Sequence, residues 1–156
     1  MTDNEQLIHN FYTSFNNKDY KAMQACYADN ATFNDAVFKN LNSEQVKAMW
    51  EMLILKGKDL RIEFSNISSD GNNVKAHWDA YYTFSATGKK VVNNIDARFE
   101  IENGKIVKHT DTFDFHTWST QALGIKGFLL GWTTFLRKKV TAQAMKNLDG
   151  FMKAKV

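Results

Sequence analysis

The fold is decided by residues 91–113, which read VVNNIDARFEIENGKIVKHTDTF. Apolar and polar residues alternate on both sides of Asn103-Gly104, and this period of two predicts two β-strands joined by a hairpin. A two-residue turn would gather four ionisable side chains on one face but mix apolar with polar residues on the other. A three-residue loop, with Gly104 in the left-handed conformation, brings the apolar residues of both strands together. Because a one-residue slip moves every side chain to the opposite face, we predict the three-residue loop.

This register places Asn93, His109 and Asp111 on the apolar face. Residues 74–84 alternate in the same way, and a two-residue loop at Thr87-Gly88 would pair them with the strand that follows. Burying polar groups without partners costs several kcal/mol, so each of the three needs a partner, a water molecule or a ligand. Side chains then form rows across three strands: Trp78–Ala97–His109, Ala80–Ile95–Asp111 and Tyr82–Asn93–Phe113.

Helical periodicity precedes this sheet. Apolar residues of the first predicted helix recur at i, i+3 and i+4 within residues 7–15. Asp19 is the expected N-cap of a second helix that reaches Tyr27. Asn42, with Gln45 three residues later, is the expected cap of a third helix.

The tail is expected to form one closing helix. The last strand would run from Lys105 to about Thr117, so that Phe113 and Phe115 extend its apolar face. Helices, then a meander of antiparallel strands, then a helix make an α+β plan. From Trp118 onward apolar residues recur every fourth position, and we expect this helix to pack by the stripe of Phe128, Trp132, Leu136 and Val140.

Length and composition exclude several classes of protein. The chain has 156 residues, 44% of them hydrophobic and 24% charged, which fits one globular domain and excludes a disordered chain. A net charge of +3, without a dense basic stripe, argues against nucleic-acid binding. Cys26 is the single cysteine, no Cys/His spacing resembles a zinc site, and we expect no metal or cofactor. The first residues lack the features of a signal peptide, and the longest apolar run is too short for a bilayer, so we expect a soluble, cytoplasmic protein.

Two motifs resemble those of a known superfamily. Residues 27–35, YADNATFND, closely resemble the signature after the second helix of ketosteroid isomerases. Residues 101–114, IENGKIVKHTDTFD, resemble the last hairpin of SnoaL-like polyketide cyclases and the matching strand of limonene-epoxide hydrolases. Together they point to the nuclear transport factor 2-like superfamily. The resemblance implies a cystatin-like α+β cone, a curved antiparallel sheet wrapped around N-terminal helices, over residues 1–117. Residues 118–156 would then be a helical extension, packed on the same domain or on a dimer partner.

The resemblance also implies roles for individual residues. Asp35 falls at the position of the isomerase general base, and Asp111 falls where the cyclases keep their acid/base aspartate. The oxyanion donors of the isomerases are not matched: their tyrosine falls on Phe11, with Tyr12 one residue off, and their protonated acid falls on Ala97. Since each missing donor costs about 10²–10³ in rate, we do not expect a steroid isomerase of the usual mechanism.

The candidate site therefore has two sets of residues, and each has a structural alternative. Asp111 and His109 could form a structural pair, Asp35 could cap the loop that follows it, and Asn93 could pair with Tyr82. The aromatic residues could be core rather than pocket wall. The candidate catalytic residues are Asp111, His109 and Asp35, and the candidate ligand-binding residues are Asn93, Trp78, Tyr82, Phe113, Tyr12 and Phe11.

We expect a small-molecule pocket protein that transfers protons on a hydrophobic, carbonyl-bearing substrate, as an isomerase, cyclase or hydratase. The alternative is a non-catalytic ligand-binding or dimerisation module of the same fold. Because family members commonly pair through the outer face of the sheet, we expect a homodimer through Asp79, Tyr81, Asp96 and Arg98, here called the outer-face patch. Membrane contact by the apolar tail, which residues 137–139 follow with three positive charges, is less expected than packing on the domain.

Overall fold

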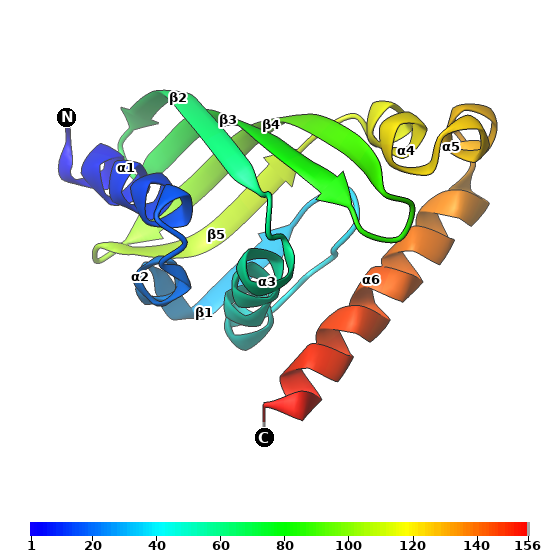
Figure 1. Cartoon of the computed structure of the whole chain (residues 1–156). Coiled ribbons are helices and arrows are strands. Elements are labelled where there is room, and N and C mark those ends of the chain that lie inside the picture. The colour runs from blue at the N-terminus through cyan, green and yellow to red at the C-terminus, as the bar shows by residue number, and fades with distance from the viewer. Residues whose placement is uncertain (156) are drawn as a thin grey trace.

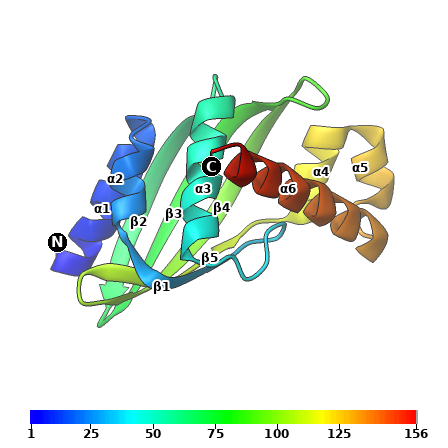
Figure 2. The same ribbon diagram turned by 90° about the horizontal axis from the view of Figure 1, so that it is seen from below.

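Five strands form one curved sheet in the computed structural model, which describes residues 1–155 (Figure 1). The strand order is β1-β5-β4-β3-β2, and helices α1, α2 and α3 lie on one side of the sheet (Figure 2). The elements are α1 (Asp3–Asn16), α2 (Tyr20–Ala25), β1 (Tyr27–Asn34), α3 (Ser43–Lys56), β2 (Arg61–Asp70), β3 (Asn73–Phe84), β4 (Lys89–Glu102), β5 (Lys105–Thr112), α4 (Phe115–Leu123), α5 (Ile125–Leu130) and α6 (Thr134–Ala154).

The N-terminal helices begin at the predicted caps. The Asn42 side chain accepts a hydrogen bond from the backbone N–H of Gln45, whose own side chain returns to the Asn42 backbone. Asp19 caps α2 through the N–H of Ala22. The extent of the second helix is wrong in the sequence analysis, because Tyr27 begins strand β1.

Strand β1 makes the sheet mixed. It pairs with β5 in parallel, whereas all other neighbours in the sheet are antiparallel. The predicted α+β fold with a curved sheet is confirmed, and the one difference from the predicted antiparallel pairing lies at this edge. The parallel pairing matters for the site, because it places the carboxyl ends of β1 and β5 side by side.

The β4–β5 hairpin differs from the predicted loop. Asn103 and Gly104 both have positive φ, 50° and 72°, and form a two-residue turn between Glu102 and Lys105. The pairing then shifts by one residue, because Glu100 lies opposite Lys108. This β-bulge leaves Val107 as the extra residue on β5. The predicted three-residue loop is therefore wrong. Because the bulge shifts β5 by one residue, His109 and Asp111 still lie on the predicted inner face of the sheet.

Opposing partners across the sheet also differ from the predicted rows. A four-residue loop, residues 85–88, joins β3 to β4, so Trp78 lies opposite Ile95 and not opposite Ala97. On β5, His109 lies opposite Phe99 and Asp111 opposite Ala97. Both offsets amount to two residues, and a shift of two keeps each side chain on its predicted face. Asn93, His109 and Asp111 are accordingly buried on the inner face.

The tail forms three helices instead of one. Strand β5 ends at Thr112 and Asp114 caps α4, so Phe115 belongs to a helix and does not extend the strand. Helix α6 then runs back to α3, where Lys155 forms an ion pair with Glu51. The predicted packing stripe is right for Leu136, which is buried, and partly right for Val140, which is half-buried. It is wrong for Phe128 and Trp132, which are exposed. No helix within residues 1–155 is long and apolar enough to cross a membrane.

Candidate functional site

A chain of hydrogen bonds crosses the interior from helix α3 to the end of β5. The Trp50 indole N–H donates to the Tyr27 hydroxyl at 2.8 Å, and that hydroxyl lies 2.8 Å from His109 Nδ1. The other ring nitrogen, His109 Nε2, lies 2.8 Å from the Asp111 Oδ1. All four side chains are buried. The chain therefore fixes both the position and the ring orientation of His109.

The donors of this chain can be assigned because an indole nitrogen only donates. Burial raises the pKa of Tyr27 well above its ordinary value, so its hydroxyl keeps its proton. With the Trp50 N–H on the hydroxyl oxygen, the Tyr27 proton points to His109 Nδ1. His109 is then neutral and donates from Nε2 to Asp111, and every hydrogen in the chain has an acceptor. A protonated His109 would leave the Tyr27 hydroxyl proton without an acceptor.

Asp35 lies at the same end of the sheet as Asp111. Strands β1 and β5 are in parallel register, with Asn34 opposite Thr110, so the next residues of the two strands are neighbours. The Asp35 Oδ1 accepts the backbone N–H groups of Val37 and Phe38 at 2.7 and 2.6 Å. Burial raises the pKa of Asp35 from 3.8 to about 6, although these two bonds oppose the shift. Asp35 thus caps its loop and is also a carboxyl group that titrates near neutrality.

Two buried donors in the same interior have no partner. The Tyr12 hydroxyl and the Trp78 indole Nε1 make no hydrogen bond within the part of the chain that the structure describes. Their rings lie 6.1 Å apart, centroid to centroid. Burial, followed by the Asp111 carboxylate, raises the pKa of Tyr12. Tyr12 is a candidate ligand-binding residue although the isomerase tyrosine position falls on Phe11, and both side chains fit within the wide buried face of α1.

The other candidate ligand-binding residues have different surroundings. Phe11 is part of the aromatic core, and its ring lies nearly perpendicular to that of His109 at a centroid distance of 5.9 Å. The Tyr82 hydroxyl accepts the indole N–H of Trp118 at 2.7 Å, and within residues 1–155 it makes no hydrogen bond with Asn93. Asn93 is buried on β4, and Phe113 lies half-buried between β5 and α4.

Sequence reasoning missed Tyr27, Trp50 and Trp118 as members of the site. Aromatic residues at helical or strand spacing are interpreted as apolar positions, and the polar atom of the side chain is then overlooked. The available signal is the polar atom that each carries, since buried Tyr and Trp side chains usually need a hydrogen-bond partner. His109 and Asp111, two residues apart on the inner face, are the partners that the spacing did predict.

Helix α4 packs against β4. Gln121 makes two hydrogen bonds with the Val92 backbone, from its amide nitrogen at 3.0 Å and to its amide oxygen at 2.8 Å. The Thr87 hydroxyl donates to the Ala122 carbonyl, also on α4. Six rings from α1, α3, β3 and β4 pack together in the interior with centroid separations of 5.2–6.2 Å: Phe11, Tyr12, Phe15, Trp50, Trp78 and Phe99.

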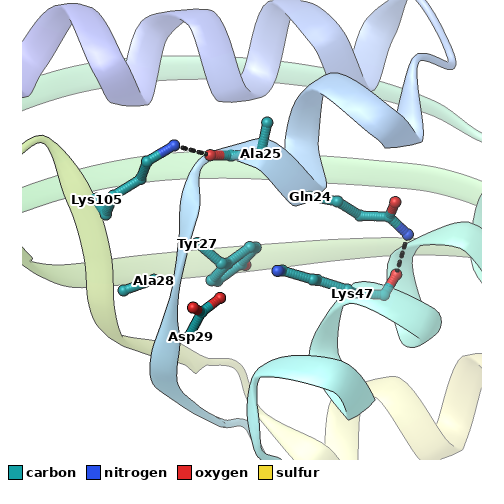
Figure 3. A pocket seen from close by; sticks show the side chains of 7 residues that line it. All are labelled: Gln24, Ala25, Tyr27, Ala28, Asp29, Lys47 and Lys105. Atoms are coloured by element: carbon teal, nitrogen blue, oxygen red, sulfur yellow. Dashed lines mark hydrogen bonds between the residues drawn. The ribbon is translucent and has the colours of Figure 1, made fainter.

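A separate surface pocket of about 400 Å³ lies between α2, β1, α3 and β5 (Figure 3). Lys105 donates there to the Ala25 carbonyl, and Gln24 donates to the Lys47 carbonyl. Its mouth thus carries charged and amide groups, which do not suit a hydrophobic carbonyl compound. Neither Asp35 nor Asp111 lines it. Within residues 1–155, no group of three or more His, Cys, Asp or Glu side chains could hold a metal ion.

Comparison with known proteins supports the resemblance seen in the sequence. The model of the SnoaL-like domain matches residues 8–109. No match was found among curated proteins.

Solved structures share the fold at low sequence identity. A proposed polyketide cyclase from Pseudomonas putida has 21% identity and a TM-score of 0.65, covering 78% of this chain and 98% of its own. A second, from Xanthomonas campestris, has 18% identity and a TM-score of 0.65, covering 76% and 96%. An LEH-like epoxide hydrolase from M. tuberculosis has 16% identity and a TM-score of 0.63, covering 83% and 96%.

Proposed function

Because this chain belongs to the SnoaL-like domain family, we propose that it is a small-molecule enzyme of the acid/base type. Its substrate would be a hydrophobic compound with a carbonyl group, and its reaction an isomerisation, a cyclisation or a hydration. The neighbours described as polyketide cyclases and as an epoxide hydrolase act on small organic molecules by name, which fits this class. Residues 1–117 would form the catalytic domain and residues 118–156 a helical extension of it.

In this proposal Asp111 is the base. His109 donates to its Oδ1 and holds it in place, so His109 is a positioning residue. Asp111 would take a proton from the carbon beside the substrate carbonyl, and the electron pair of that C–H bond would move onto the carbonyl oxygen as an enolate. Asp35 has a pKa of about 6, so part of its population is protonated near neutrality and can return a proton to another carbon.

The unpartnered donors are the observation that carries the proposal. A buried donor without an acceptor costs about 1–3 kcal/mol, and a core selected only for stability would avoid two of them. The Tyr12 hydroxyl and the Trp78 indole N–H lie in the interior that also holds Asp111. A substrate carbonyl oxygen would satisfy them, and its developing negative charge would strengthen both hydrogen bonds.

A second function is favoured by the packed aromatic interior. Six rings, each in contact with at least one of the others, leave the core well filled, as expected of a module that binds a ligand or a partner without catalysis. In such a module the pair of His109 and Asp111 would be purely structural. The two proposals differ in one property, which is whether Asp111 exchanges protons with a bound carbonyl compound.

The experiment is hydrogen–deuterium exchange beside the carbonyl of hydrophobic ketones and enones, followed by NMR in D₂O. The protein should accelerate exchange for at least one compound, and Asp111→Asn should slow it about 100-fold or more while circular dichroism stays unchanged. Asp29→Asn, an exposed aspartate on β1, is the matched control and should behave like wild type. Unchanged exchange in Asp111→Asn would refute the assignment of the base. Binding of these compounds without any exchange would favour the non-catalytic module.

We also propose a homodimer through the outer-face patch. On this face His77 lies 2.9 Å from both Asp79 and Asp96, and these carboxylates raise its pKa. The Arg61 guanidinium lies over the Tyr81 ring, 4.0 Å from its centroid. A face with a half-buried aromatic ring among paired charges resembles the composition of protein–protein interfaces, in which Tyr and Arg are enriched.

A further inference from the structure

Helix α5 and the start of α6 expose a cluster of large apolar side chains. Each is between 45% and 75% exposed. The sequence favours packing of this segment on the domain, but the structure directs these side chains away from it. We call this cluster the apolar elbow: Ile125, Phe128, Leu129, Leu130, Trp132 and Phe135. It lies at the end of the molecule far from α1 and the N-terminus (Figures 1 and 2).

Close packing behind the elbow fixes its orientation. Gly127 is buried, and a Cβ atom on it would lie 1.8 Å from the Ser119 carbonyl oxygen, so α5 sits directly on α4. The His116 ring stacks on Trp132 at 3.8 Å between centroids, and its Nε2 lies 3.0 Å from the Phe128 carbonyl oxygen. The apolar side chains are therefore presented outward by a packed scaffold. An apolar cluster of this kind on a protein surface marks a site of contact with another protein or with a membrane.

The charges around the elbow indicate whether its partner is a protein or a membrane. Residues 115–148 contain no Asp or Glu, whereas they contain five basic residues. Four of these lie next to the elbow and are exposed: Lys126, Arg137, Lys138 and Lys139. A second copy of the chain would bring the same positive charges together, which disfavours self-association through this surface. Anionic lipid headgroups beside acyl chains match both the basic residues and the apolar ones.

We propose that the apolar elbow docks on the surface of an anionic phospholipid bilayer. Trp132, Phe128 and their neighbours enter the interface between headgroups and acyl chains, and Arg137 to Lys139 contact the phosphates. The segment lies on the membrane and does not cross it, which agrees with its length of little more than two helical turns before the basic cluster. The inference does not depend on the proposed chemistry of the interior.

Trp132 provides the test, because it is 75% exposed whereas Trp50, Trp78 and Trp118 are buried. The wild-type chain is mixed with vesicles of phosphatidylcholine alone or of phosphatidylcholine with phosphatidylglycerol. With the anionic vesicles we expect a blue shift of tryptophan emission, protection of Trp132 from acrylamide quenching and co-sedimentation of the protein. Raising the salt concentration should weaken binding, since headgroup contacts are screened.

Three variants separate the elbow from general charge attraction. Arg137→Glu/Lys138→Glu/Lys139→Glu should weaken binding to anionic vesicles at least tenfold, and Leu129→Ser/Phe135→Ser should do the same without changing the charge. Lys21→Glu/Lys75→Glu/Lys108→Glu makes the same change in net charge on other exposed surfaces and should bind within threefold of wild type.

Three results would overturn the proposal. The first is the absence of both blue shift and co-sedimentation with anionic vesicles. The second is an equal loss of binding in the lysine control. The third is a concentration-dependent dimer that Leu129→Ser/Phe135→Ser abolishes, because this would make a second copy of the chain the occupant of the elbow.

Discussion

Asp35 should destabilise the protein at neutral pH, and its replacement by Asn should relieve this cost. Burial raises the pKa of Asp35 from 3.8 to about 6. Between these values the native state binds the proton that the unfolded state has released, so the free energy of unfolding falls as the pH rises. The stabilising contribution is complete below pH 3.8 and is lost above pH 6. At about 1.36 kcal/mol per pKa unit, the loss amounts to about 3 kcal/mol.

Asparagine keeps the shape of this site and removes its charge. Its amide oxygen can accept the N–H groups of Val37 and Phe38 as the Asp35 Oδ1 does. Asp35→Asn should therefore match wild type near pH 4 and exceed it by up to about 3 kcal/mol at pH 7. The neutral amide is the weaker acceptor, which makes this figure an upper bound. For a chain of this size, the melting temperature at pH 7 would rise by about 6–12 °C.

Urea unfolding at pH 4, 5, 6 and 7, followed by tryptophan fluorescence, measures this difference. Contributions of other carboxyl groups cancel when the variant is subtracted from wild type at each pH. Asp29→Asn removes an exposed carboxylate from the same strand and should change stability by less than about 0.5 kcal/mol. A loss of stability in Asp35→Asn at pH 7, with the pH slope of wild type, would refute the burial argument. If Asp35 also acts as the acid, the stabilised variant should return the proton to the other carbon of the substrate more slowly.

Three other perturbations test separate parts of the structure. Tyr27→Phe leaves a buried indole N–H and His109 Nδ1 without partners, so urea titration should show a loss of about 2–6 kcal/mol; a loss below 1 kcal/mol would contradict the chain of hydrogen bonds. Gly127→Ala should lower the melting temperature in calorimetry because its Cβ meets the Ser119 carbonyl. Gly150 lies on α6 with open space around it, so Gly150→Ala should raise the free energy of unfolding by about 0.5–1 kcal/mol. If the two glycine substitutions changed the stability equally, this would contradict the close packing of α5 on α4. Light scattering should show a dimer, and a monomer at high protein concentration would refute the proposed dimer through the outer-face patch.

The sequence predicts the inner face of the sheet well because burial imposes it at many positions at once. Alternation over β3 and β4 leaves one choice of face, and a register error of two residues does not change it. The same pattern contains little information on which residues lie opposite one another. Trp78 could lie opposite Ile95 or opposite Ala97, and both registers bury the same kinds of side chain. The loop between Phe84 and Lys89 therefore decides which register forms.

The candidate site is predictable where a polar residue interrupts an apolar series, as His109 and Asp111 do. Tyr27 and Trp50 complete the site from β1 and α3. Tyr27 lies 82 residues from His109 in the sequence, and Trp50 is linked to His109 by hydrogen bonds only through Tyr27. Periodicity describes each element by itself, and such a contact arises only when the elements are packed. The parallel pairing of β1 with β5 is non-local in the same way, and it is what makes Asp35 a neighbour of Asp111.

The bulge at Val107 explains why the predicted hairpin loop is wrong although the predicted buried face of β5 is right. It also determines which β5 side chains reach the candidate site. Asn-Gly is the strongest local signal for a two-residue turn, and the structure has that turn. Uninterrupted alternation from the buried Ile106 would then direct Lys108 and Thr110 inward and place His109 and Asp111 in solvent. One extra residue on β5 reverses the alternation, so Ile106 and His109 are both buried. The two-residue turn and the buried face are separate constraints on β5. Because the bulge satisfies both, it brings His109 onto the inner face beside Asp111.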